Sequence, residues 1–397
     1  MKLRTLDSTK QLWEGKRVLL RVDWNVPIQN GHPADLSRIQ ETLPTIRQLL
    51  EAHCQIILMT HLGRPVASID PKDWDPNFSI QILRQSAEKV IGEHILVDSS
   101  TSQDISFNDH FQSASLVLLN NLRFHPGEEA NDPTFAQDLA RLGDFYVNDA
   151  FSASHRAHAS IVGIPSYLPS AAGICLEKEV KALISVLQDP IRPFSGIIGG
   201  AKISTKLSVI SNLLPKLDYL MIGGAMAHTF LKAQGYEIGA SMIEEALVPT
   251  AQAILTSNPE KIILPVDARG TLDGQIASWD WTACPLNGVA FDIGPKTRDQ
   301  FAQILQKSQT IIWNGPVGRF EEDAFRDGTT SIAQWISALT QTGCRTIAGG
   351  GDTIHALNQA KISPSSFSHV STAGGAFLEW LEGRSLPGVD ALMGKLS

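Results

Sequence analysis

Several arginines of this sequence follow short apolar segments, in or just after the turns where those segments end. They are Arg38, Arg64, Arg123 and Arg156, with His61 and His158 close by in the same turns. The guanidinium group is a planar fork of donors that suits phosphate and carboxylate groups. If these turns share one sheet edge, the residues predict a site for a small ligand with several negative charges. The alternative for each arginine is a surface residue that pairs with a nearby acid.

A second group of turns consists of glycines, each between an apolar run and a segment with helical periodicity. They are Gly199-Gly200, Gly223-Gly224, Gly349-Gly350-Gly351 and Gly374-Gly375. Glycine lets backbone N–H groups approach a phosphate, and the following helix N-terminus adds a favourable dipole. The pattern predicts a nucleotide site, although glycine is also simply a frequent turn residue.

Lys202 and Lys206 follow the first glycine turn on one helix face, where two like charges are mildly unfavourable unless an anion binds between or above them. The alternative is a solvated helix face. Asp352 directly follows the triple glycine. Phosphate would repel this carboxylate unless a cation intervened, which favours Mg²⁺. Asp352 could also cap the next helix, and the two roles are compatible.

Several familiar signatures are absent. There is no G-x-x-x-x-G-K-[ST] motif of Walker-type sites and no G-x-G-x-x-G fingerprint of dehydrogenases. No H-E-x-x-H motif occurs, and His155 and His158 without a third ligand make a poor zinc site. A dehydrogenase is therefore disfavoured.

The elements that must position these residues are strands that alternate with helices. Helices are expected at Leu36–Ala52, with a kink or a late start because of Pro44, and at Ser79–Val90 and Thr134–Leu142. Strands are expected at Arg17–Val22, Gln55–Thr60, Ser115–Asn120, Asp144–Asn148, Gly196–Ile198, Tyr219–Ile222, Lys261–Pro265, Thr310–Trp313, Thr346–Ala348 and His369–Ser371. Such alternation predicts an α/β fold with parallel sheets, and ligands bind at the edge where the strand-to-helix turns meet.

Length and composition agree with two such halves in a soluble enzyme or ligand-binding protein. The 397 residues predict two or three domains, with a boundary in the Pro-, Ser- and Gly-rich segment Ile164–Gly173. A net charge of −8 argues against a protein that coats nucleic acid or anionic membranes. Four scattered cysteines, no apolar leader and no long apolar run predict a cytoplasmic protein without disulfides or membrane spans.

Over essentially its whole length the sequence resembles the phosphoglycerate kinase family. The matching segments, in the family's order, are RVDWNVP (21–27), HLGRP (61–65), NLRF (121–124), SHRAHAS (154–160), GGAKISTK (199–206), DIGPKT (292–297), WNGPVGRFE (313–321), GGGDT (349–353) and STAGGAFLEWLEG (371–383). The resemblance implies two doubly wound, Rossmann-like lobes around a cleft, joined by a hinge helix. Residues 1–172 would form the phosphoglycerate-binding lobe, with 383–397 folding back onto it, and 173–382 the nucleotide-binding lobe.

The resemblance also implies reversible phosphoryl transfer from 1,3-bisphosphoglycerate to ADP, giving 3-phosphoglycerate and ATP, in glycolysis, gluconeogenesis or carbon fixation. Mg²⁺ would be required, and the enzyme would be a monomer that closes at its hinge, with no nucleic-acid or membrane partner. Phosphoglycerate would be bound by Asp23, Asn25, Arg38, His61, Arg64, Arg123 and Arg156. Nucleotide would be bound by Lys206, Gly294, Glu321, Gly350, Gly351, Asp352 and Thr353, with Asp352 as the metal ligand. Arg38, Lys202, Gly351 and Gly374 would be catalytic.

The residues suit this chemistry, because the phosphoryl acceptor is already ionised and needs no general base, only in-line positioning and charge neutralisation. An anion-binding or regulatory protein without catalysis is the alternative. The presence of Arg38, Lys202, Lys206 and Asp352 together argues against it.

The sequence departs from the family pattern at a few positions and over residues 268–285. The single positions are Trp24, His228, Arg319 and Ala373, where Phe, Asn, a small or apolar residue and Gly are usual. Alanine at 373 would cost about 1 kcal/mol or more if that position required a positive φ.

Overall fold

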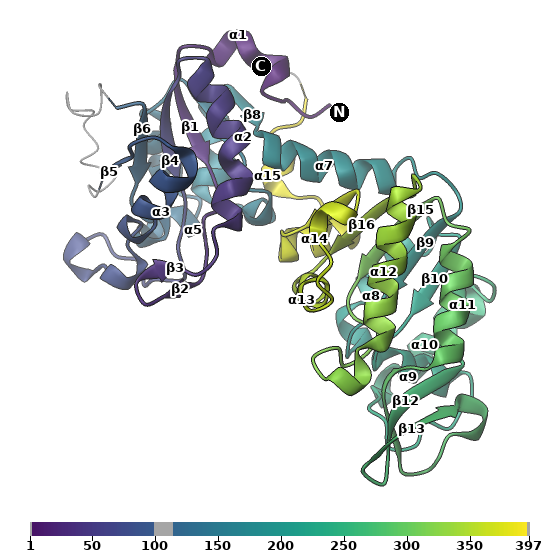
Figure 1. Ribbon diagram of the computed structural model, residues 1–397. Coiled ribbons are helices and arrows are strands. Elements are labelled where there is room, and N and C mark those ends of the chain that lie inside the picture. Colours follow the sequence, from purple (N-terminus) through teal and green to yellow (C-terminus); the bar gives the residue numbers. More distant parts are fainter. Residues whose placement is uncertain (1, 99–113, 395–397) are drawn as a thin grey trace. The chain divides into compact units, whose positions relative to one another are not determined.

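The computed structural model describes residues 2–98 and 114–394, and the chain divides into two compact units (Figure 1). Unit 1 comprises Met1–Val180 and Ser385–Ser397, and unit 2 comprises Lys181–Arg384. The boundary therefore falls inside helix α7 (Ile174–Leu187), a few residues beyond the Pro- and Gly-rich segment. The C-terminal segment belongs to unit 1, where the Arg4 side chain donates to the carbonyl of Ala391 at 2.7 Å.

Unit 1 is built on a six-stranded, fully parallel sheet in the order β5-β6-β4-β1-β7-β8. Its strands are β1 (Arg17–Arg21), β4 (Gln55–Met59), β5 (Leu96–Asp98), β6 (Leu116–Leu119), β7 (Phe145–Asn148) and β8 (Ser170–Ala172), and a small hairpin is formed by β2 (Ile28–Gln29) and β3 (His32–Pro33). The helices are α1 (Lys10–Trp13), α2 (Ser37–Glu51), α3 (Gln81–Ile91), α5 (Pro126–Glu129), α6 (Pro133–Ala140), the first half of α7, and α15 (Pro387–Asp390).

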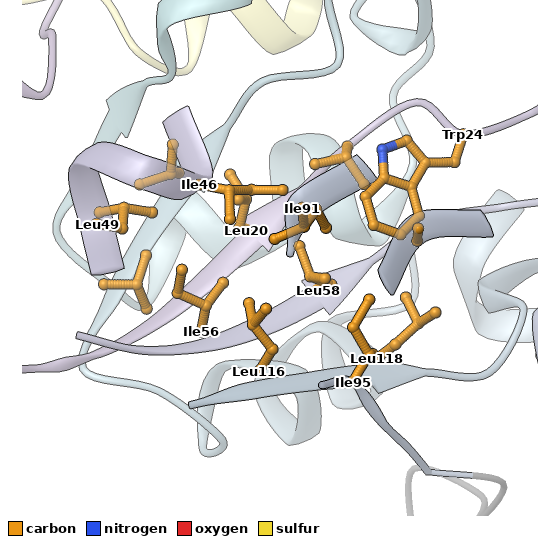
Figure 2. Close-up of a cluster of buried hydrophobic side chains, with 14 of the residues drawn as sticks. Leu20, Trp24, Ile46, Leu49, Ile56, Leu58, Ile91, Ile95, Leu116 and Leu118 are labelled. Atoms are coloured by element: carbon orange, nitrogen blue, oxygen red, sulfur yellow. The ribbon is translucent and has the colours of Figure 1, made fainter. Parts of the chain in front are cut away.

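Both faces of this sheet are covered, because side chains of each strand alternate between two cores. On one face, Leu20 of β1 and Leu58 of β4 pack with Ile46 of α2. Figure 2 shows this cluster, with Leu20, Trp24, Ile46, Leu49, Ile56, Leu58, Ile91, Ile95, Leu116 and Leu118 labelled. On the other face, Leu19 and Ile57 pack with Leu139 of α6. The near-continuous apolar strands of the sequence thus follow from burial on both sides.

Of the kink or late start predicted for the first long helix, the late start does not occur. Helix α2 begins at Ser37 and runs to Glu51 with Pro44 inside it. A proline there removes the amide that would otherwise donate to the carbonyl of Gln40, and its ring crowds that carbonyl, but the helix continues through it. Arg38 consequently lies in the first turn of α2.

Unit 2 contains a second six-stranded parallel sheet in the order β11-β10-β9-β15-β16-β17. Its strands are β9 (Phe194–Ile198), β10 (Tyr219–Ile222), β11 (Ile262–Ile263), β15 (Thr310–Asn314), β16 (Arg345–Gly349) and β17 (His369–Ser371). The helices are the end of α7, α8 (Leu207–Leu213), α9 (Met226–Ala233), α10 (Val248–Ser257), α11 (Pro295–Leu305), α12 (Asp327–Gln341), α13 (Gly351–Gln359) and α14 (Gly374–Leu381).

An antiparallel sheet in unit 2 was not expected from the sequence. It has the order β13-β12-β14 and consists of β12 (Asp267–Leu272), β13 (Gln275–Asp280) and β14 (Gly288–Ile293). Its central strand reads DARGTL, which carries no apolar run or clean alternation. The prediction of two parallel α/β sheets is confirmed, and all four cysteines are free. Among the described residues, no helix is both long and apolar enough to cross a membrane.

Candidate functional site

The first group of predicted residues gathers at the carboxyl edge of the unit 1 sheet. Asp23 follows β1, His61 follows β4, and Arg123 follows β6. These strands are parallel neighbours or next neighbours, so their C-terminal ends meet at one edge. Arg38 reaches the same place from the first turn of α2, where its Nη1 donates to the carboxylate of Asp23.

Asp23 is the anionic centre of this edge. Its carboxylate also accepts hydrogen bonds from the Ser152 hydroxyl and from the amide of Asn25, the latter at 3.1 Å. Burial alone would raise the pKa of Asp23, but the Arg38 guanidinium, the Ser152 hydroxyl and the charge of Arg21 hold that pKa below its usual value. Asp23 is therefore ionised and fixes the position of Arg38.

His61 is a neutral donor. Burial and the charge of Arg21 lower the pKa of His61 well below its usual value, although Asp23 opposes them. Nη2 of Arg21 lies 3.1 Å from Nδ1 of His61. Because a guanidinium can only donate, Nδ1 must accept, and the imidazole proton is on Nε2. At this edge His61 can therefore donate to an anion without carrying charge itself.

The loop that carries Arg64 is tied down by two of the predicted residues. Oδ1 of Asn25 accepts from the amide of Gly63 at 2.8 Å, and Nη1 of Arg123 donates to the carbonyl of Gly63 at 2.5 Å. Arg123 is buried, whereas Arg64 is exposed. Asn25 and Arg123 thus help to hold the loop, and Arg64 remains available to a ligand.

The remaining cationic residues lie near enough to repel one another. Burial lowers the pKa of Arg123, and the charges of Arg156 and Arg64 lower it further. The charges of Arg123 and Arg156 also add to the effects of burial and Arg21 that lower the pKa of His61. His158, beside them, is kept neutral because burial and the charge of Arg21 lower its pKa to about 4. The structure therefore brings together the residues predicted to bind an anion in unit 1.

Sequence reasoning missed a buried layer beneath this site. Nε of Arg21 donates to the hydroxyl of Ser160 at 3.0 Å, and that hydroxyl donates to Glu128 at 2.5 Å. Glu128 is fully buried, and burial raises its pKa against the opposing effect of Arg21. Arg21 is a charged residue inside an otherwise apolar strand, and that exception was the available signal.

In unit 2 the glycine turns pack backbone against backbone at the carboxyl edge of the sheet. A Cβ on Gly199 would lie 2.0 Å from the carbonyl oxygen of Pro316, so no larger residue fits. Gly224 has a φ of +68° and lies against the carbonyl of Gly200 in the same way. Gly199 and Gly224 are therefore required by close approach, and their turns pack through the backbone against each other and against Gly315 and Pro316.

Side-chain hydrogen bonds hold these turns in place. Nζ of Lys206 donates to Oδ1 of Asn314 at 2.5 Å, and the Asn314 amide donates to the carbonyl of Gly349 at 2.7 Å. The hydroxyl of Thr353 accepts from the amide of Gly315 at 2.8 Å. Burial lowers the pKa of Lys206, while Asp352 and Glu382 oppose that shift. A half-buried cation whose one hydrogen-bond partner is neutral is suited to receive an anion.

Beside the turns lies a cavity of about 460 Å³, a size typical of small-ligand sites. It is lined by Gly200, Gly224, His228, Trp281, Phe291, Arg319, Phe320, Glu321 and Asp352, among others. Glu321 and Asp352 of the predicted nucleotide residues thus line it. Gly294 does not, and it packs instead against the Asp267 carboxylate as the N-cap of α11.

The remaining predicted residues of unit 2 lie at the starts of helices. Lys202 is exposed just before the turn that leads to α8, and Gly351 and Gly374 open α13 and α14. Ala373 has a φ of −85°, so alanine is unstrained there and the expected cost does not arise.

Asp352 is exposed in the first turn of α13. The N-cap of that helix is Gly350, with a φ of +102°, so the alternative reading of Asp352 as the N-cap is wrong. In the described part of the chain, no three His, Cys, Asp or Glu side chains are grouped to hold a metal. A single carboxylate in the first turn of a helix would fit Mg²⁺ that arrives with a nucleotide, because Mg²⁺ uses few protein ligands and several phosphate oxygens.

Two parallel α/β units, one with a cationic sheet edge and one with glycine turns beside a cavity, fit the class of phosphotransferases. Comparison with known proteins narrows this class, because the family model described as phosphoglycerate kinase matches residues 9–384. The chain therefore belongs to the phosphoglycerate kinase family, and phosphoglycerate kinase activity is its function.

Individual relatives are similar to this chain over nearly their whole length. The chain is 44% identical to a phosphoglycerate kinase of Methylorubrum extorquens over 400 residues, 98% of both chains. It is 44% identical to that of Moorella thermoacetica over 391 residues, 96% of this chain and 97% of the relative. The solved phosphoglycerate kinase of Coxiella burnetii matches with a TM-score of 0.90 at 35% identity, over 98% of this chain and 99% of that one.

Proposed function

We propose that unit 1 binds the phosphoglycerate and unit 2 the nucleotide in reversible transfer of a phosphoryl group from 1,3-bisphosphoglycerate to ADP. The observation that carries this assignment is the cationic edge of unit 1, where arginines surround neutral His61. Several guanidinium groups and few free anions suit a substrate that carries both phosphate and carboxyl groups.

In this proposal the phosphoglycerate is held by Arg64, Arg123 and Arg156, with His61 as a neutral donor. Arg38 neutralises charge on the phosphoryl group in flight, and Asp23 positions Arg38 through their ion pair. Lys202 and the helix N-termini at Gly351 and Gly374 would add to that neutralisation.

No general base is needed, because both possible acceptors, a carboxylate and a nucleotide phosphate, are ionised. The site residues agree with this requirement. Asp23 and Glu128 are engaged in ion pairs or hydrogen bonds. His61 and His158 are neutral, and neither is needed as a base, because the acceptor has no proton to lose. Catalysis then depends on positioning, charge neutralisation and exclusion of water from an acyl phosphate.

On the nucleotide side, Lys206 and the turn Gly350–Thr353 would hold phosphates, and Glu321 would accept from ribose hydroxyls. Asp352 would hold Mg²⁺, which neutralises phosphate charge when bound. Because the two ligands would be bound by different units, the units must bring them together for transfer. We further propose that the enzyme acts as a cytoplasmic monomer.

A coupled assay with Mg-ATP and 3-phosphoglycerate tests the proposal, with formation of ADP as the readout. Turnover should require the nucleotide, 3-phosphoglycerate and divalent cation, and excess chelator should abolish it. Binding of 3-phosphoglycerate measured without nucleotide should be lost in Arg156→Ala and retained in Arg47→Ala, an exposed arginine of α2 outside the cluster. Absence of turnover above background, or equal binding by both variants, would contradict the assignment.

A further inference from the structure

His228 is a polar residue of the unit 2 cavity to which the proposed reaction assigns no role. It lies on α9, directly after the Gly223-Gly224 turn, and its side chain is 6% exposed. Together with Trp281 it lines the cavity, and the two rings lie 5.4 Å apart at 55°. Trp281 is itself 3% exposed, so the imidazole is held against a fixed aromatic surface.

The proton of His228 can be assigned from its contacts. Nδ1 lies 3.0 Å from the carbonyl oxygen of Met242. A carbonyl oxygen only accepts, so Nδ1 carries the hydrogen. Burial lowers the pKa of His228 to about 4, against an opposing effect of the Met242 hydrogen bond, so at neutral pH the ring has no second hydrogen. Nε2 therefore presents a lone pair.

Within the described part of the chain, Nε2 of His228 makes no hydrogen bond to protein. The indole Nε1 of Trp281, a donor, is buried without a partner, whereas the buried acceptors of the cavity wall and its guanidinium are occupied. Asp267 accepts from the N-terminus of α11, and Asp292 accepts from the amides of Ile293 and Gly328. The Arg319 guanidinium, half-exposed, is paired with Glu322 at 3.0 Å and lies over the ring of Phe291. His228 is thus the buried wall residue with a vacant acceptor.

We propose that His228 selects adenine over guanine nucleotides, its Nε2 accepting a hydrogen bond from the exocyclic amino group of adenine. The proposal rests on the nucleotide site proposed above. Adenine carries an amino donor where guanine carries the O6 acceptor. Guanine would therefore bring an acceptor against the Nε2 lone pair, and one of the two groups would be left buried without a hydrogen-bond partner. Such mismatches of buried polar groups discriminate more strongly than a lost apolar contact.

The expected discrimination is set by these two effects. Loss of the amino hydrogen bond should reduce kcat/KM by roughly twofold to tenfold. The unpaired acceptor with guanine should reduce it further, so that ATP is preferred to GTP by more than about tenfold.

The experiment measures kcat/KM for ATP, GTP and purine riboside triphosphate, which lacks the amino group, at saturating 3-phosphoglycerate. Wild type should prefer ATP to both analogues. His228→Phe keeps an aromatic ring and removes the acceptor, so the preference for ATP over GTP should fall roughly tenfold, and ATP and purine riboside triphosphate should become equivalent. His94→Phe, an exposed histidine of unit 1, should leave every ratio unchanged.

Glu321→Gln separates this inference from the proposed nucleotide site, because Glu321 is assigned to the ribose that all three nucleotides share. If Glu321→Gln raises KM for all three alike and His228→Phe leaves the ratios unchanged, the role of His228 is wrong and the nucleotide site stands. If neither variant alters any nucleotide KM, the proposed site itself fails. Should His228→Phe not fold, equal use of ATP and purine riboside triphosphate by wild type overturns the inference on its own.

Discussion

Removal of the Arg38 side chain should lower both kcat and the free energy of unfolding, for different reasons. In the folded protein the guanidinium donates to Asp23, and the two side chains are 30% and 12% exposed. Arg38→Ala should lower kcat by roughly 10²- to 10³-fold, the cost of losing one preorganised charge at the transferring group. It also leaves the Asp23 carboxylate with only the Ser152 hydroxyl and the Asn25 amide. With the partial exposure of this pair, the free energy of unfolding should fall by about 1–2 kcal/mol.

The double variant Arg38→Ala/Asp23→Asn separates the two effects. Neutralising the stranded carboxylate should restore most of the lost stability in urea unfolding, because no uncompensated charge remains. It should restore none of the kcat, because the cation that faces the phosphoryl group is still missing. Arg47→Ala on the same helix is the matched control and should change neither quantity. A kcat of Arg38→Ala within about threefold of wild type, or a kcat recovered in the double variant, would refute the reasoning.

Two further predictions concern carboxylates. Asp352→Ala should weaken Mg-nucleotide binding by roughly tenfold in calorimetry and leave 3-phosphoglycerate binding unchanged, whereas equal loss of both ligands would point to misfolding. Asp149 is buried at the N-terminus of α7, and burial raises its pKa to about 6 against the opposing hydrogen bonds. The folded state thus favours the protonated form of Asp149, which stabilises the fold at low pH. That stabilisation is lost as the pH rises from the ordinary pKa of an aspartate through about 6. Asp149→Asn should therefore gain roughly 1 kcal/mol relative to wild type between pH 5 and pH 7 in urea unfolding, and a constant difference would contradict this.

The sequence predicted the parallel sheets well because their strands are buried on both faces. Tyr219–Ile222 and His369–Ser371 form strands with the predicted bounds, and most other strands differ by one or two residues at an end. The antiparallel sheet β12–β14 escaped prediction because its strands alternate polar and apolar residues irregularly. Local pattern carries no information about which strands will pair when burial is partial.

The sequence predicted which turns carry the residues of the candidate site. Asp23, His61 and Arg123 follow strands that the sequence identifies, so their convergence followed from parallel topology. The tautomer of His61 and the ties between Asn25, Arg123 and the Gly63 backbone depend on contacts between turns far apart in the chain. No spacing in the sequence encodes those distances.

The sequence by itself determined the alternation of strands and helices, the turns in which the cations and glycines lie, and the family to which the chain is similar. It could do so because hydrophobic period and turn chemistry are local properties. The tertiary structure alone decided that Gly199 must be glycine, that Ala373 is unstrained, and that His228 keeps a bare acceptor in the unit 2 cavity. Each of these depends on burial and on a partner distant in sequence, which are set only when the chain is packed.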